Sequence, residues 1–157
     1  MEKNLLGRDF PFADGILDGK TALVCGASKG IGRATALVLA RAGCRVIACA
    51  RSVGDLDSLI EEMHGSGHEK LVLDMESLES ISTSVSDLGS VDILVNNSGG
   101  PPGGPLLGNS IEDFEGPFAR HLHAHILTKE LVPGMERSGS GRTVSYTHLT
   151  LPTSIQV

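Results

Sequence analysis

Short apolar runs alternate with amphipathic stretches along the first hundred residues, and this alternation limits the possible folds more than any other feature. The runs at residues 21–25, 45–50, 70–74 and 91–97 read as buried strands, because they show little polar alternation. Strands that alternate with helices pair in parallel through right-handed crossovers, with helices on both faces of the sheet. We therefore expect an α/β fold with a doubly wound parallel sheet.

Three apolar stripes define the helices between these runs, each with the spacing of one helix face. Gly43 follows the first stripe, at a position where glycine commonly ends a helix. Ser52 and Asp55 precede the second stripe with the spacing of a capping-box start. The stripes consist of Ile31, Ala34, Val38 and Ala42; of Leu56, Leu59, Ile60 and Met63; and of Leu78, Ile81, Val85 and Leu88.

The composition excludes several classes of protein. A length of 157 residues with 40% hydrophobic and 20% charged side chains fits one globular domain. A net charge of −6 without a cluster of Lys and Arg argues against binding to nucleic acid. No run approaches the roughly 18 apolar residues of a membrane span, and residues 1–15 are too charged for a signal-peptide core. We expect a cytoplasmic protein with neither nucleic-acid nor membrane partners.

The three cysteines, Cys25, Cys44 and Cys49, are expected to be buried reduced thiols. Their number is odd and no CxxC spacing occurs, which argues against disulfides and against a zinc site.

A glycine-rich turn follows the first predicted strand, where ligands of open parallel sheets bind. Glycine lets the backbone turn sharply and approach phosphates, while the following helix offers free amide donors and a partial positive charge. A generic tight turn is the alternative, but the strand before it and the helical stripe after it favour binding of a dinucleotide pyrophosphate. The predicted contacts are Gly26, Ala27, Ser28, Lys29, Gly30, Ile31 and Gly32.

The spacing Gly-x-x-x-Gly-x-Gly of this turn, within LDGKTALVCGASKGIG at residues 17–32, resembles the opening of the short-chain dehydrogenases/reductases. NNSG at residues 96–99 is similar to the family's Asn-Asn-Ala-Gly. Asp74 matches the family's acidic residue that binds the adenine amino group, and Met75 supplies a neighbouring backbone contact. The resemblance thus adds to the cofactor site Asp74, Met75, Asn97, Ser98 and Gly99.

Each of these matches has an alternative explanation. Asp74 could cap the helix that follows it, and Asn97 could serve its own loop through turn hydrogen bonds. Their joint occurrence at strand ends favours the family, which implies hydride transfer between a nicotinamide cofactor and a small carbonyl or alcohol substrate, in a homo-oligomer.

The choice of cofactor is predicted from the charges after the second strand. Enzymes that use NAD commonly place a carboxylate there for the adenosine ribose hydroxyls. This chain has Ala50, Arg51 and Ser52 instead, and Lys29 lies in the glycine turn. Arg51 and Lys29 would attract a 2′-phosphate, so we expect NADP(H) rather than NAD(H), with Arg51 and Ser52 as the cofactor contacts after this strand. The alternative is that both are solvated surface charges.

A Gly/Pro-rich loop at residues 99–110 follows NNSG and is expected to form an active-site rim. It resembles a subset of the family described as 3-oxoacyl-acyl-carrier-protein reductase-like. Ser110 and Asp113 suggest the start of the next helix, although Pro117 could shift that start to its own position. The apolar stripe of this helix is Phe114, Phe118, Leu122 and Ile126.

In the family the corresponding helix carries an Asn that supports a proton relay. The matching position falls at Arg120 or, with one deletion, at His121, so this Asn is absent. His121 and His125 would share a helix face as metal ligands do, but no HExxH pattern accompanies them. Packing of His121, His123 and His125 against a partner subunit is favoured, and no metal site is predicted.

The family's chemistry requires a Tyr, a Lys four residues later and a Ser. Residues 141–143 suggest the start of a fifth strand, but the only tyrosine, Tyr146, is followed four residues later by Thr150. No catalytic residue is therefore assigned, and this chain is predicted to be inactive. VSYTHLTLPT resembles a translated sequencing adapter, so residues 144–157 are expected to be non-native. An authentic, catalytically inactive nucleotide-binding or regulatory module is the alternative.

These observations predict the organisation of the chain. Residues 1–16 form an N-terminal extension and residues 17–143 an incomplete NAD(P)-binding domain of Rossmann type, followed by the tail 144–157. The domain would contain about four to five of the family's seven strands, and the parent protein would be an NADP-dependent reductase or dehydrogenase.

Overall fold

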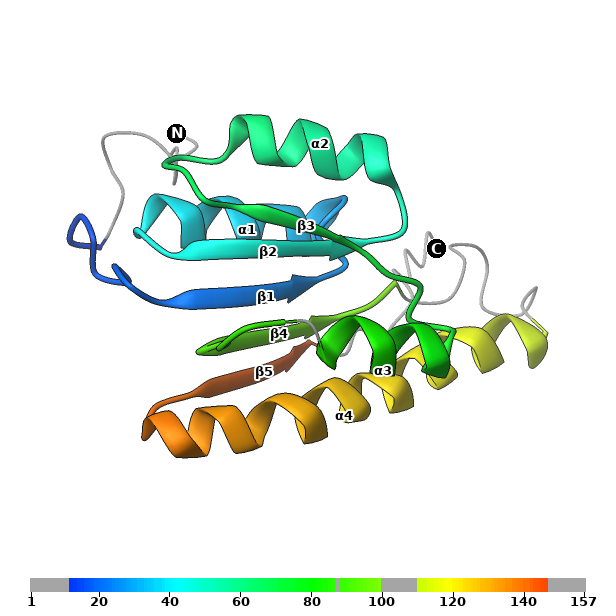
Figure 1. Ribbon diagram of the computed structural model, residues 1–157. Coiled ribbons are helices and arrows are strands. Elements are labelled where there is room, and N and C mark those ends of the chain that lie inside the picture. Colours follow the sequence, from blue (N-terminus) through cyan, green and yellow to red (C-terminus); the bar gives the residue numbers. More distant parts are fainter. Residues whose placement is uncertain (1–11, 87, 100–109, 147–157) are drawn as a thin grey trace, which may run out of the picture.

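The computed structural model describes residues 12–86, 88–99 and 110–146. Most of the expected N-terminal extension (1–16), of the expected rim loop (99–110) and of the expected tail (144–157) therefore lies outside the described residues. These residues form a five-stranded parallel sheet in the order β3-β2-β1-β4-β5 (Figure 1). Strands and helices alternate throughout, which confirms the predicted α/β fold of Rossmann type. The strands are β1 (Thr21–Cys25), β2 (Arg45–Ala50), β3 (Glu69–Val72), β4 (Ile93–Asn97) and β5 (Arg142–Tyr146).

Helices cover both faces of the sheet, as the crossover rule requires. On one face lie α1 (Gly30–Arg41) and α2 (Val53–Glu62), and on the other α3 (Leu78–Ser86) and α4 (Glu112–Ser138) (Figure 1). Successive strand residues point to opposite faces and join two separate cores. In β1, for example, Val24 packs in the core under α1 and α2, whereas Leu23 packs in the core under α3 and α4.

The sheet reverses its winding between β1 and β4. From β1 the chain moves outward to β2 and β3, and it then returns to add β4 and β5 on the other side. A ligand site is expected where the winding reverses, beyond the carboxyl ends of the strands. The parallel register brings Cys25, Cys49 and Asn97 to that one edge, because Cys25 pairs with Cys49 and β4 runs alongside β1.

The helix ends follow the sequence signals. Gly43, with φ at +94°, stands directly after the C-cap of α1. Ser52 is the N-cap of α2, and its Oγ accepts a hydrogen bond from the Asp55 amide at 3.4 Å. Both predicted helix boundaries are confirmed.

The start of α4 differs from the alternative that placed it at Pro117. The helix begins at Glu112, because the Ser110 amide donates to the Asp113 carboxylate at 2.9 Å and the Phe114 amide donates to the Ile111 carbonyl at 3.0 Å. Pro117 lies inside the helix, where it removes one backbone hydrogen bond without ending it.

The apolar stripe predicted for α4 is largely wrong as a core face. Phe118 and Leu122 are 57% and 58% exposed, and Ile126 is only partly buried against the core. In a helix, a residue four positions later is displaced by about 40° around the helix axis. A stripe with this spacing therefore turns away from the core face within three steps. The face that is buried consists of Ala124, Leu127, Leu131 and Met135.

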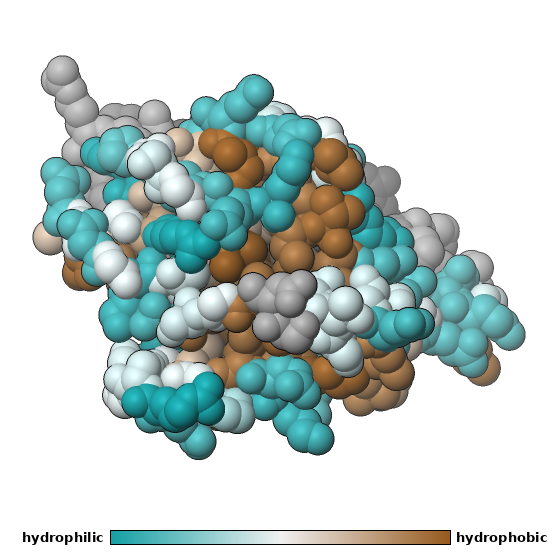
Figure 2. Space-filling view, viewed as in Figure 1, coloured by the Kyte–Doolittle hydropathy of each residue, from teal (hydrophilic) through white to brown (hydrophobic). Residues whose placement is uncertain are grey.

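Both edge strands of the sheet are exposed. Val72 in β3 is 49% exposed, and Leu78, the first residue of α3, is 48% exposed. Figure 2 shows hydrophobic side chains reaching the surface on this side of the molecule. At the other edge every residue of β5 is exposed, and this strand continues to Tyr146, beyond the boundary expected at residue 143.

Two findings concern the predicted absences. None of the described helices is long and apolar enough to cross a membrane. Among the same residues, no group of three or more His, Cys, Asp or Glu side chains is arranged to hold a metal ion. Cys25, Cys44 and Cys49 are buried free thiols, as expected.

Candidate functional site

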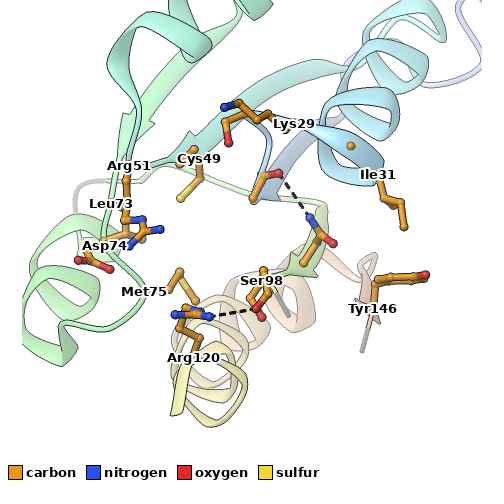
Figure 3. Close-up of a pocket in the computed structure, with 16 residues that line it drawn as sticks. Lys29, Ile31, Cys49, Arg51, Leu73, Asp74, Met75, Ser98, Arg120 and Tyr146 are labelled. Carbon is orange, nitrogen blue, oxygen red and sulfur yellow. Dashed lines mark hydrogen bonds between the residues drawn. The ribbon is translucent and has the colours of Figure 1, made fainter. Parts of the chain in front are cut away.

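A cleft of about 600 Å³ opens at the carboxyl ends of the strands (Figure 3). Arg51 and Asp74 lie on one side of this cleft, Ile31 and Tyr146 lie on the opposite side, and Arg120 reaches it from α4. The complete lining is Gly26, Ser28, Lys29, Gly30, Ile31, Cys49, Ala50, Arg51, Leu73, Asp74, Met75, Asn97, Ser98, Gly99, Arg120 and Tyr146.

The turn between β1 and α1 requires its glycines for steric reasons. Gly26 has φ at +61°, a conformation that L residues rarely adopt. A Cβ on Gly32 would lie 2.2 Å from the Gly26 carbonyl oxygen and 2.8 Å from the Asn97 side-chain nitrogen. Helix α1 therefore packs against this turn with no room for a side chain, which brings its N-terminus to the cleft.

The N-terminus of α1 lacks the side-chain cap that the next helices possess. Its N-cap residue, Lys29, makes no side-chain capping hydrogen bond. In contrast, Ser52 caps α2, and the Ser77 Oγ accepts from the Ser80 amide at 3.2 Å at the start of α3. The first amides of α1 remain available as donors and carry the positive end of the helix dipole, which suits an anionic phosphate.

Asn97 braces the glycine turn from β4. Its side-chain nitrogen donates to the carbonyl oxygens of Cys25 at 3.3 Å and Gly26 at 3.4 Å. The Asn97 side chain thus connects the ends of β4 and β1, and the alternative in which it serves its own loop is wrong. The neighbouring Asn96 is buried, and its side-chain nitrogen donates to Thr128 of α4 at 3.1 Å.

Asp74 forms part of the cleft wall after β3. Its Oδ1 accepts a hydrogen bond from the Glu76 amide at 3.0 Å, which shapes the turn into α3. The cap of α3 is Ser77 rather than Asp74, so the alternative of a capping role for Asp74 is wrong. Met75, the next residue, is buried and also lines the cleft.

The positive charges at the cleft differ in their surroundings. Arg51 is exposed and forms no ion pair with the residues that the structure describes. Lys29 is 80% exposed, and its Nζ lies 3.6 Å from the Asp55 carboxylate. Ala50, which precedes Arg51 at the end of β2, provides no carboxylate at that position.

The predicted cofactor residues converge on this cleft, with three exceptions. Ala27 is fully buried, and its amide donates to the Cys49 carbonyl at 3.0 Å. Gly32 lies behind the turn, and Ser52 caps α2 instead of lining the cleft. These three residues support the turn and the helices around the cleft and lie outside its lining.

Sequence reasoning did not assign Cys49, Ala50, Leu73, Arg120 or Tyr146 to the site. Cys49, Ala50 and Leu73 stand at strand ends beside assigned residues, so the rule of strand ends could have included them. The hydrogen bond with Cys25 and then burial raise the pKa of the Cys49 thiol, which keeps this thiol protonated and argues against a nucleophilic role.

Arg120 lies in the first third of α4, and no local pattern assigns it to the cleft. Its guanidinium pairs with the Glu76 carboxylate, and its Nη2 donates to the Gly99 carbonyl at 3.2 Å. One turn later, His123 donates from Nδ1 to the Met75 carbonyl at 2.8 Å. Of the two candidate positions for the family's Asn, Arg120 lines the cleft, whereas His121 does not.

The fold and the cleft thus define an α/β protein with a dinucleotide-type site. A sequence profile of the short chain dehydrogenases matches residues 20–148, which is most of the chain. The chain belongs to the short-chain dehydrogenase family.

Known relatives support this assignment and show how much of them the chain spans. L-Xylulose reductase of Mesocricetus auratus is 40% identical over 116 residues, which cover 74% of this chain and 47% of the relative. A 3-oxoacyl-acyl-carrier-protein reductase of Vibrio harveyi is 35% identical over 133 residues, or 82% of this chain and 54% of the relative. The chain therefore spans about half the length of these relatives.

A solved structure shows the same likeness in three dimensions. A metagenomic short-chain oxidoreductase in complex with NADP aligns with a TM-score of 0.73 and 31% identity, over 82% of this chain and 61% of that chain. The parallel sheet is thus that of the family, and the resemblance stated for the glycine turn is confirmed.

Proposed function

We propose that this chain forms the NADP(H)-binding part of an oxidoreductase. The whole protein would transfer hydride between nicotinamide and the carbonyl or alcohol carbon of a small molecule. The observation that carries the proposal is the exposed Arg51 at the end of β2, beside a cleft that also receives the uncapped N-terminus of α1. The solved relative in complex with NADP supports this choice.

The residues of the cleft fit a dinucleotide by their chemistry. The free amides of α1 would bind the pyrophosphate, and a Cβ on Gly30 would meet nothing within 4 Å, so the backbone is open to a ligand there. The Asp74 Oδ1 accepts a hydrogen bond from the Glu76 amide, so Oδ2 would be the oxygen that accepts from an adenine amino group. Asn97, Ser98 and Gly99 would border the nicotinamide half.

The preference for NADP(H) rests on charge. Arg51 offers a planar pair of donors to a 2′-phosphate, and Lys29 adds a second charge in the glycine turn. A carboxylate after β2 would repel this phosphate, and Ala50 and Ser52, which flank Arg51, supply none. A charge-assisted hydrogen bond contributes about 1.5–3 kcal/mol, or roughly 10- to 150-fold in affinity.

Binding can be followed through Tyr146. It is the only tyrosine in a chain without tryptophan, and it lines the cleft. NADPH should quench its fluorescence and bind at least about tenfold more tightly than NADH. Arg51→Gln should abolish most of this difference while leaving NADH affinity unchanged. Arg142→Gln, at the opposite end of the sheet, is the matched control, and equal binding of NADPH and NADH by the wild-type chain would refute the preference.

The isolated chain should have no reductase activity, because no Tyr-x-x-x-Lys occurs in its sequence. The same observation favours a second candidate, a catalytically inactive nucleotide-binding module. Turnover of a ketone by the purified chain would contradict both the predicted inactivity and this second candidate. The transcript of the gene distinguishes the two proposals, since an enzyme requires Ser, Tyr and Lys downstream and a genuine module ends without them.

The remaining expectations concern the whole protein. We propose a cytoplasmic homo-oligomer that acts on a small carbonyl or alcohol compound. Fractionation of the source cells and sedimentation of the full-length product would test these points.

A further inference from the structure

One charged side chain connects the two walls of the cleft. Arg120 pairs with Glu76 in the turn after β3. It also donates to the Gly99 carbonyl after β4, the hydrogen bond drawn at Arg120 in Figure 3. The turn after β3 carries Asp74 and Met75, whereas the end of β4 carries Asn97, Ser98 and Gly99. The contacts of Arg120 thus span the adenine side and the nicotinamide side of the proposed cofactor site.

We propose that Arg120 is a positioning residue that holds these two walls at the separation a dinucleotide requires. This inference rests on the proposed function, because it assigns a role within the same cleft. The role does not require contact with the cofactor, since Arg120 acts through Glu76 and Gly99.

The surroundings of the Arg120 guanidinium favour a role in holding its two partners in fixed positions. The Arg120 side chain is only 18% exposed, whereas its partner Glu76 is 46% exposed. A planar guanidinium has donors in a fixed fork, so it can satisfy a carboxylate and a carbonyl at once, which an ammonium does less well. A partly buried charge that keeps both partners restricts the movement of the groups it joins.

A second contact from the same helix limits the freedom of the turn after β3. His123 stands three residues after Arg120 on α4, and its Nδ1 donates to the Met75 carbonyl. Residues three apart lie on one helix face, so Arg120 and His123 contact two successive residues of the turn. Helix α4 itself is fixed to the sheet by buried Leu127 and by the hydrogen bond from Asn96 to Thr128.

The inference predicts a difference between ligands of two lengths. Adenosine 2′,5′-bisphosphate contacts only the adenine side, whereas NADPH must reach both walls. Loss of Arg120 frees the walls from each other, so only the longer ligand must order them again on binding. We expect Arg120→Met to weaken NADPH binding about tenfold and to change binding of the bisphosphate less than about twofold.

The test uses the full 157-residue chain and four variants, with both affinities measured by calorimetry. Arg137→Met removes an exposed arginine of the same helix and should bind both ligands as the wild type does. Glu76→Gln removes the carboxylate that pairs with Arg120 and should weaken NADPH binding by less than Arg120→Met does. Arg120→Lys, which keeps the charge, should recover part of the NADPH affinity and serves as the second variant if Arg120→Met does not fold.

A purely structural role predicts another outcome. General destabilisation would lower the melting temperature but leave the ratio of the two affinities unchanged among folded molecules, and that result would overturn the inference. Failure of the wild-type chain to bind NADPH would refute the proposed function instead. In that case, hydrogen exchange without ligand tests the role of Arg120. Amides at residues 75–77 should exchange faster in Arg120→Met than in Arg137→Met, and equal exchange rates would overturn the inference.

Discussion

Replacement of Gly32 by alanine should displace α1 from the sheet, although alanine is the better helix former. The new Cβ would lie 2.2 Å from the Gly26 carbonyl oxygen and 2.7 Å from its carbon, and both distances are well short of the 3.4 Å at which ordinary contact begins. Both atoms belong to the backbone, so the helix itself must move. Overpacking of this kind costs about 1–3 kcal/mol, which exceeds the gain of up to about 1 kcal/mol from the helix propensity of alanine.

The neighbouring helix offers a matched control for this prediction. Gly54 lies within α2, and a Cβ there would meet nothing within 4 Å. Gly54→Ala should therefore stabilise the chain by about 0.5–1 kcal/mol through propensity alone. Urea unfolding followed by circular dichroism measures both changes, and NADPH titration should show weakened binding only for Gly32→Ala. Equal stabilisation by the two substitutions would refute the close packing deduced for Gly32.

Three further predictions address other parts of the fold. Hydrogen bonds from the Thr21 amide and then from Lys20 lower the pKa of Asp92. Asp92→Asn should therefore lower the free energy of unfolding by about 1 kcal/mol at neutral pH. This loss should disappear as the pH falls below the ordinary pKa of 3.8, because the wild-type carboxylate is then protonated as well. Unfolding curves across pH would contradict this if the loss grew in acid. Asn97→Asp should impair NADPH binding more than Asn97→Ala does, because a carboxylate facing two carbonyl oxygens repels them; calorimetry that ranks the variants in reverse refutes it. Leu127→Ala should lower the free energy of unfolding by about 2–5 kcal/mol, since this side chain is fully buried, and a loss below 1 kcal/mol would contradict its place in the core.

The strands and the glycine turn could be predicted because their determinants are local. A buried strand needs a short apolar run, and the turn needs glycine where a Cβ would strike the backbone, as at Gly32. The third strand was predicted to reach Asp74, but it ends at Val72. Leu73 and Asp74 follow the last paired residue and turn toward the cleft and α3, a change of direction that apolar patterning does not report.

The details of α4 could not be obtained in the same way. Which face of a helix is buried depends on where it contacts the sheet, and Phe118 and Leu122 fit an apolar stripe without facing the core. Arg120 reaches residues 44 and 21 positions away in sequence, so its role depends on tertiary packing. The family resemblance offered Arg120 and His121 as alternatives for one position and gave no indication of the partners of either.

The missing cap at the start of α1 sets the stability of this helix against the proposed recognition of a phosphate. Serine or aspartate in place of Lys29 would strengthen this helix start by about 1 kcal/mol, as such caps do elsewhere. The same side chain would occupy the amides that face the cleft, and aspartate would add a charge of the wrong sign for phosphate. A more stable helix start and the proposed nucleotide binding therefore require different side chains at this single position.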